Sequence, residues 1–161
     1  MLKKLRLYLE TSIFNCLFDD HKPAEKADTW RLWDEIKTGK YEAVVSDIAI
    51  AEIENCPPEF FVKKDLMYGE LGNIAYTRID VENDDQTKAL AKRYIENGGL
   101  PPRCKIDALH LAAASLFGCD VVLSWNCKHI VKFRAMRVVD GVNAMENLSP
   151  VKLLRPDTFL N

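Results

Sequence analysis

The chain has 161 residues and a mass of 18.4 kDa, with 48% hydrophobic and 29% charged residues. This composition is sufficient for one folded core and excludes a disordered or fibrous protein. The formal net charge of −2 excludes an overall basic field that would attract nucleic acid, so any attraction to RNA must come from local basic clusters. We expect a single domain over residues 1–161.

The predicted elements alternate between strands and helices along the chain. In chain order they are a strand at residues 5–9, a short helix from Ser12, a helix at 23–38, a strand at 41–45, a helix stopped by Pro57 and Pro58, a helix at 58–71, a strand at 74–79, a helix at 84–97, a helix at 105–117, a strand at 120–124, and a short helix with a last edge strand within 138–154. This alternation predicts an α/β fold of three layers, with a mostly parallel sheet of four to five strands and helices on both faces. In such sheets ligands bind beyond the carboxyl ends of the strands.

Two local signals refine this pattern. Ser46 or Asp47 can cap the helix that follows the second strand. The helix at 105–117 is predicted to bury one apolar face. That face carries Ile106, Leu109, Ala113 and Leu116.

The five cysteines are an odd number and form no Cys-x-x-Cys pair. This spacing argues against a disulfide framework or a cysteine zinc site, and it indicates a reducing, cytoplasmic location. The longest apolar stretch, residues 108–118, is interrupted by His110 and Ser115 and is too short to cross a bilayer. We therefore expect no membrane association.

Four oxygen-bearing side chains are expected to meet at the carboxyl edge of the sheet. Glu10 ends the first strand, Glu52 lies in the second turn of a helix, Asp107 lies in the first turn of another, and Asn126 follows a buried strand. Such hard oxygen ligands suit Mg²⁺ or Mn²⁺ rather than zinc. A bound metal of this kind can deprotonate a water molecule and stabilise the leaving oxygen of a phosphodiester. Without it, repulsion should raise the pKa of at least one carboxyl group.

Each of these residues also has a purely structural explanation. An acid at a strand end or in the first turn of a helix often serves as a cap or a partner of the helix dipole, and for Asp107 this explanation has even weight. Glu52, next to Glu54, could be a solvated helix residue. Asn126 alone would more often be a turn residue than a ligand.

Five segments resemble, in their order and spacing, the motifs of the PIN-domain family, in particular the VapC-like toxin ribonucleases of type II toxin–antitoxin systems. They are residues 8–12 (YLETS), 46–52 (SDIAIAE), 107–114 (DALHLAAA), 123–126 (LSWN) and 154–160 (LRPDTFL). The resemblance covers nearly the whole chain. It implies a PIN-like fold and a Mg²⁺- or Mn²⁺-dependent endoribonuclease that cuts RNA, binds a small antitoxin protein and forms a homodimer.

Carried over by position, the resemblance implies that Glu10, Glu52 and Asp107 are catalytic metal ligands. Asn126 would hold the metal or its water where the family usually has a fourth acid, and Ser12 would orient the first carboxylate. Two residues depart from the family pattern, because Glu10 stands in place of Asp and Asn126 in place of an acid. The loss of the acid at Asn126 implies a weaker second metal position, and a one-metal site or reduced activity would follow.

Contacts with the substrate are expected from Thr11, Lys128 and His129. Thr11 can also orient the first carboxylate. Two basic clusters could attract phosphate, although either could equally be a solvated face. One comprises Lys128, His129, Lys132, Arg134 and Arg137, and the other Lys3, Lys4 and Arg6.

His110, one turn after Asp107, is predicted to pack in the core with one nitrogen satisfied, and the alternative is a contact with a neighbouring carboxylate. Aromatic residues on the early helices are likewise expected in the core, with a groove for a partner's helix as the alternative, where the family binds its antitoxin. These aromatic residues are Trp30, Trp33, Phe60, Phe61 and Tyr68.

Two other functions are alternatives to a ribonuclease. A catalytically weakened or inactive module that binds RNA or protein would have the same fold, and Glu10 and Asn126 favour it. A different α/β enzyme, such as a phosphatase or nucleotide hydrolase, is disfavoured because the first strand lacks an Asp-x-Asp motif and the chain lacks a Gly-x-x-x-x-Gly-Lys phosphate loop.

Overall fold

A sheet of five parallel strands forms the centre of the computed structural model, which describes residues 2–161. Every neighbouring pair of strands is parallel, and the order across the sheet is β3-β2-β1-β4-β5. The strands are β1 (Arg6–Leu9), β2 (Glu42–Ser46), β3 (Tyr76–Ile79), β4 (Val121–Leu123) and β5 (Lys152–Leu154). The predicted α/β fold is confirmed, and the last edge strand is β5.

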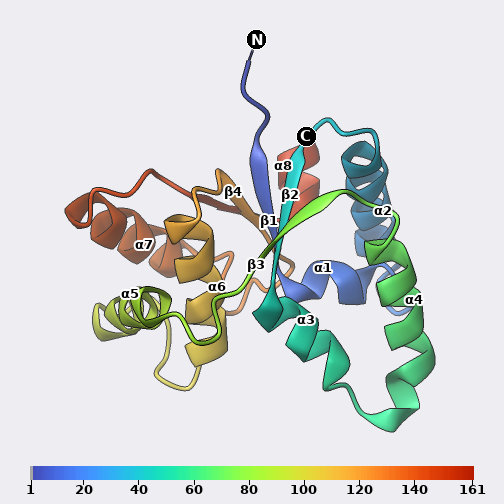
Figure 1. The fold of residues 1–161 in the computed structure, drawn as a ribbon, viewed down its shortest axis with the longest axis horizontal. Coiled ribbons are helices and arrows are strands. Elements are labelled where there is room, and N and C mark those ends of the chain that lie inside the picture. The colour runs from blue at the N-terminus through green and yellow to red at the C-terminus, as the bar shows by residue number, and fades with distance from the viewer. Residues whose placement is uncertain (1) are drawn as a thin grey trace.

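Helices cover both faces of this sheet (Figure 1). Helices α5, α6 and α7 lie on one side, and α1, α2 and α4 lie on the other. The helices are α1 (Thr11–Cys16), α2 (Pro23–Lys37), α3 (Asp47–Glu54), the 3-10 turn η1 (Pro58–Phe60), α4 (Phe61–Leu71), α5 (Asp85–Glu96), α6 (Lys105–Leu116), α7 (Phe133–Met145) and α8 (Pro156–Leu160).

Strand β1 shows why the sheet is buried on both faces. Successive side chains of a strand point to opposite faces, so Tyr8 packs in the core beneath α5, α6 and α7, whereas Leu7 and Leu9 pack against α1 and α2. All three side chains are fully buried. A parallel sheet needs such cover, because its crossover helices lie on the two faces.

At the C-terminal end one predicted boundary was wrong and one helix was not predicted. The helix expected after residue 138 begins at Phe133, whose side chain is 72% exposed, so the apolar period weakens in its first turn. Helix α8 was not predicted, because it has only five residues and begins with Pro156 at its first position.

The predicted buried face of α6 was correct in part: Ala113 is buried, and Leu109 and Leu116 pack partly buried against the core. Ile106 is 46% exposed, whereas Ala108, Leu111, Ala112 and Ser115 are buried. Small alanine side chains let neighbouring elements pack closely on several sides of this helix, so its burial does not follow its largest apolar residues.

Within residues 2–161, no helix has the length and apolar character needed to cross a membrane. The five cysteines are all free thiols.

Candidate active site

The predicted acidic residues lie at the carboxyl edge of the sheet, where the charges of Glu10 and Glu52 act on Asp107. Glu10 directly follows β1, Glu52 lies in α3 after the neighbouring strand β2, and Asp107 lies in the first turn of α6. Burial raises the pKa of Asp107, and the charge of Glu10 and then that of Glu52 act in the same direction. The nearby His110 and His129 oppose this increase, yet the pKa of Asp107 remains raised. Mutually repelling carboxylates in the absence of metal are expected to behave in this way.

Glu10 caps the helix that follows it. Its Oε2 accepts a hydrogen bond from the backbone N–H of Ser12 at 2.8 Å, and its Oε1 accepts from the hydroxyls of Ser12 at 2.7 Å and Ser124 at 2.5 Å. A carboxylate has about four acceptor positions, so three are filled and one remains on Oε2. The structural explanation of Glu10 is therefore correct, and its role as a metal ligand stays a prediction that rests on this one position.

Ser12 connects the ends of β1 and β4. Its hydroxyl donates to Glu10 and accepts the backbone N–H of Trp125 at 2.8 Å. This geometry is the one expected for a residue that orients the first carboxylate.

We expect Ser12→Ala to lower the free energy of unfolding by about 1–3 kcal/mol, because the N–H of Trp125 loses its acceptor in a partly buried position. Urea denaturation would measure this change. Ser149→Ala is a suitable control, since Ser149 is exposed and makes no hydrogen bond within residues 2–161. Equal effects of the two substitutions would contradict the bridging role of Ser12.

Glu52 is held by two side chains. Its Oε1 accepts hydrogen bonds from the Thr11 hydroxyl at 2.8 Å and from Nε2 of His110 at 2.6 Å. Its Oε2 accepts none from the described part of the chain, and 41% of the side chain is exposed. Burial raises the pKa of Glu52, but the hydrogen bond and charge of His110 and the hydroxyl of Thr11 outweigh it and lower the pKa overall.

The prediction for His110 was therefore incomplete. The imidazole is fully buried, but both of its nitrogens are satisfied, one by Glu52 and the other by the Tyr8 hydroxyl at 2.6 Å. The Tyr8 hydroxyl lies 2.7 Å from the hydroxyl of Ser46, which in turn accepts the N–H of Ala49 as the cap of α3. These hydrogen bonds form a series from Ser46 through Tyr8 and His110 to Glu52. If His110 is neutral, each hydroxyl or ring N–H proton in the series has an acceptor.

Thr11 is 5% exposed, and its hydroxyl is engaged with Glu52. The orienting role expected for Thr11 therefore applies to Glu52 rather than Glu10.

Asp47, another acid at this edge, has a separate, structural function, because its carboxylate accepts the backbone N–H groups of Val81 and Glu82 beyond β3.

Asp107 carries the least engaged carboxylate of the site. It is half-buried and makes no hydrogen bond or ion pair within residues 2–161. Together with Oε2 of Glu52 and the free position of Glu10, it offers hard oxygen donors. This donor set fits Mg²⁺ or Mn²⁺.

Asn126 closes the loop after β4. Its Oδ1 accepts the backbone N–H of His129 at 3.0 Å, and its backbone carbonyl accepts the N–H groups of Ile130 and Val131. This is the turn geometry of an Asn cap, so the structural alternative for Asn126 is correct. Its role as a metal ligand stays a prediction.

Lys128 and His129 line a hollow of about 320 Å³, together with Lys132 and Arg134. The loop of residues 98–102 also lines this hollow. The other predicted basic cluster does not lie here. Arg6 begins β1, at the amino ends of the strands, and it pairs there with Glu42.

The early aromatic residues divide between core and surface. Trp33 is fully buried, and its indole N–H donates to Glu70. By contrast, Phe60 and Phe61 are 47% and 46% exposed. The core prediction therefore holds for Trp33 and was wrong for the two phenylalanines.

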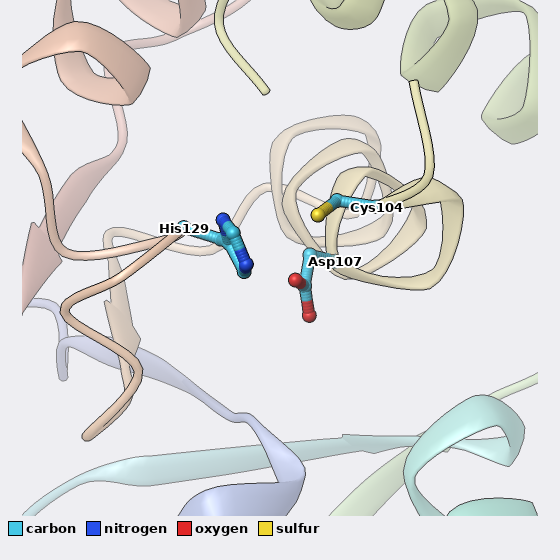
Figure 2. A group of neighbouring side chains, drawn as sticks. All are labelled: Cys104, Asp107 and His129. Atoms are coloured by element: carbon cyan, nitrogen blue, oxygen red, sulfur yellow. The ribbon is translucent and has the colours of Figure 1, made fainter. Parts of the chain in front are cut away.

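Two side chains that contact or neighbour these acids were not assigned a role from the sequence. Ser124 binds the carboxylate of Glu10, and Cys104 lies beside Asp107. Figure 2 shows Cys104 and Asp107 at the start of α6, with His129 approaching from the loop after β4. The ligand atoms of these three residues lie within 4.8 Å of one another. The i, i+3 spacing of Cys104 and Asp107 was a usable signal for one face of a helix, but His129 is distant in sequence.

Comparison with known proteins supports the fold. No family model matches the chain, and no curated protein matches it. One solved structure that it resembles is VapBC2 from Rickettsia felis bound to a DNA fragment from their promoter. That similarity has a TM-score of 0.56 and 13% sequence identity, and it covers 94% of this chain and 98% of that chain.

Proposed function

We propose that this chain is a single PIN domain and a divalent-metal-dependent endoribonuclease that acts as the toxin of a toxin–antitoxin pair. The observation that carries the proposal is the group of three carboxylates at the carboxyl edge of the sheet. Within residues 2–161, Glu52 and Asp107 have oxygens without hydrogen bonds, and the pKa of Asp107 is raised by burial and by the other acids. The likeness to the VapBC2 complex supports the same conclusion at the level of fold.

In this proposal, Asp107, Oε2 of Glu52 and the remaining acceptor position of Glu10 hold Mg²⁺ or Mn²⁺. When bound, such an ion supplies a deprotonated water and stabilises the leaving oxygen of the cut phosphodiester. Hydrogen bonds orient two of these carboxylates for the metal: Ser12 donates to Glu10, and His110 donates to Glu52. Asn126 orients the loop of His129 and can hold a water through its second lone pair.

The basic hollow is the proposed path of the RNA backbone. Lys128, Lys132 and Arg134 carry positive charge, and His129 connects the hollow to Asp107. Because net charge is −2, this local cluster would have to supply the attraction to phosphate.

We expect the double substitution Lys132→Ala, Arg134→Ala to weaken RNA binding and to reduce its salt dependence. Each lost phosphate contact should lower the slope of log K against log salt by about 0.7 for single-stranded RNA. Fluorescence anisotropy in EDTA would measure binding without cleavage. The matched control is Lys3→Ala, Lys4→Ala, at the amino ends of the strands. A larger effect of the control pair would show that RNA binds at the amino ends of the strands and not in the basic hollow.

The proposed protein partner is a small antitoxin. Helix α4 and the turn before it expose the apolar residues Phe60, Phe61, Val62 and Leu66, and an apolar helix of a partner would cover them. The neighbouring hollow, of about 350 Å³, includes Glu52 in its wall, so a bound partner would reach the acidic site. The homodimer implied by the resemblance and the cytoplasmic location indicated by the cysteine pattern stay predictions.

Cleavage of a structured RNA pool tests the function. Incubation with Mg²⁺, Mn²⁺ or EDTA should give cleavage with metal and none with EDTA. A second function, RNA or protein binding without catalysis, is favoured by the engagement of Glu10 as a cap and of Asn126 in its turn. RNA binding with no cleavage in either metal would establish that second function.

A further inference from the structure

Cys104, Asp107 and His129 form a cluster that differs in chemistry from the three acids. It combines a thiol, a carboxylate and an imidazole, and their ligand atoms lie within 4.8 Å of one another. A thiolate is a soft ligand that Mg²⁺ does not favour, whereas zinc binds cysteine, histidine and aspartate together. The cluster therefore selects a different metal from the hard oxygen site.

The geometry is close to what zinc requires. Bond lengths of about 2.0–2.3 Å in a tetrahedral site separate neighbouring ligand atoms by roughly 3.3–3.8 Å. The side chains of the cluster converge from two directions (Figure 2), and their ligand atoms are no more than 4.8 Å apart. Three protein ligands leave the fourth position for water.

Both segments that carry the cluster are held in position. The N–H of His129 is bound by the Oδ1 of Asn126, which fixes the loop after β4. On the other side, Cys104 donates its N–H to the carbonyl of Pro101 at 2.9 Å and directly precedes α6. The preceding loop packs closely on α7, since a Cβ added at Gly99 would lie 2.9 Å from Cγ1 of Val138.

We propose that Cys104, Asp107 and His129 bind Zn²⁺, and that zinc inhibits the nuclease because it takes Asp107 away from the Mg²⁺ or Mn²⁺ site. Binding converts the thiol of Cys104 to a thiolate and releases its proton to solvent. The inhibitory consequence rests on the proposed ribonuclease function, whereas the binding itself does not.

Co²⁺ is the probe for binding, because a thiolate bound to Co²⁺ gives a charge-transfer absorption in the near ultraviolet. Metal-free wild-type protein should show this band on titration with Co²⁺, and Zn²⁺ should abolish it. Cys104→Ser should lose the band, and His129→Asn should weaken Co²⁺ binding by about tenfold or more. The matched control is Cys127→Ser, which removes an exposed thiol near His129 in sequence and should keep the band.

A wild-type protein without the band, or a Cys104→Ser variant that retains it, would overturn the site. If Cys104→Ser fails to fold, the His129→Asn variant provides the test. Unchanged Co²⁺ affinity in His129→Asn would overturn the proposal.

Inhibition is tested separately in the RNA cleavage assay, with Zn²⁺ added in the presence of excess Mg²⁺. Wild type should lose activity at Zn²⁺ concentrations that leave Cys104→Ser active. Equal inhibition of the two proteins would refute the shared-ligand mechanism. Absence of any cleavage by wild type would instead refute the ribonuclease function, and the Co²⁺ spectrum would still report on the site.

Discussion

Asp107→Asn is expected to lower RNA cleavage by more than about 100-fold, since even residues that only orient metal ligands affect activity by about 10- to 100-fold. Asp107 offers the only carboxylate of the three with no hydrogen bond or ion pair within residues 2–161, so both of its oxygens are available to a metal. The amide retains the shape of the side chain but removes its charge. Initial rates with Mn²⁺ would measure the loss.

The same substitution should leave the fold intact. Burial and the charge of Glu10 raise the pKa of Asp107 above its ordinary value of 3.8, so the ionised side chain destabilises the folded state at pH 7. We expect Asp107→Asn to melt in EDTA at the same temperature as wild type or higher. In Mn²⁺ only wild type should gain stability, because it alone binds the metal tightly.

Asp85→Asn is the matched control for Asp107→Asn. Asp85 also lies in the first turn of a helix, but it is exposed and forms no hydrogen bond or ion pair in the described chain. Its substitution should leave cleavage unchanged. Full activity in Asp107→Asn, or an equal loss in Asp85→Asn, would remove Asp107 from the active site.

The second large effect is expected from His110→Ala. The substitution leaves a cavity at a fully buried position and deprives one hydroxyl proton of the Tyr8–Ser46 pair of its acceptor. These losses together should lower the free energy of unfolding by roughly 3 kcal/mol. Glu52 also loses one of its two partners, so cleavage should fall by about 10- to 100-fold in protein that remains folded.

His21→Ala provides the control for His110→Ala, because His21 is exposed and surface substitutions change stability by less than about 0.5 kcal/mol. Urea denaturation and cleavage rates would be measured on both variants. A His110→Ala protein as stable and as active as His21→Ala would show that the buried chain of hydrogen bonds contributes nothing.

The effect of His110→Ala should depend on pH in a direction set by the Glu52–His110 pair. Burial lowers the pKa of His110, but the hydrogen bond to Glu52 and the charges of Glu10 and Glu52 raise it above 6.5 overall. The contribution of His110 to the free energy of unfolding is therefore complete below pH 6.5, and it is lost as pH rises through the pKa that His110 has in the folded protein. The pKa of Glu52 is lowered from 4.5, so its contribution is present above that value and is lost as pH falls through the folded pKa. The stability lost in His110→Ala should be greatest between pH 4.5 and 6.5.

The sequence predicted the sheet well because β1 and β4 have strong local signals. The alternation of Leu7 and Leu9 with Tyr8 identified β1, and the apolar run before Ser124 identified β4. Because Glu10 directly follows β1, the parallel topology then placed it at the carboxyl edge of the sheet. The buried face of α6 could not be predicted in the same way, because Ile106 is exposed and its neighbouring alanines are buried.

The contacts within the site depend on pairs that are distant in sequence. His110 meets Glu52 across 58 positions, and Ser124 meets Glu10 across 114. Neither helix period nor strand alternation reports such pairs. For the same reason the cysteine spacing gave no indication of Cys104, whose neighbour His129 comes from a different loop.

The most direct test of the metal site is calorimetric titration of metal-free protein with Mn²⁺, comparing wild type with Asp107→Asn. Cys104→Ser serves as a control that retains all three acids. A carboxylate metal site requires that wild type and Cys104→Ser bind Mn²⁺ and that Asp107→Asn does not. If wild type binds no Mn²⁺, or if Asp107→Asn binds it with unchanged affinity, the acids at the edge of the sheet are structural and the proposed nuclease chemistry is wrong.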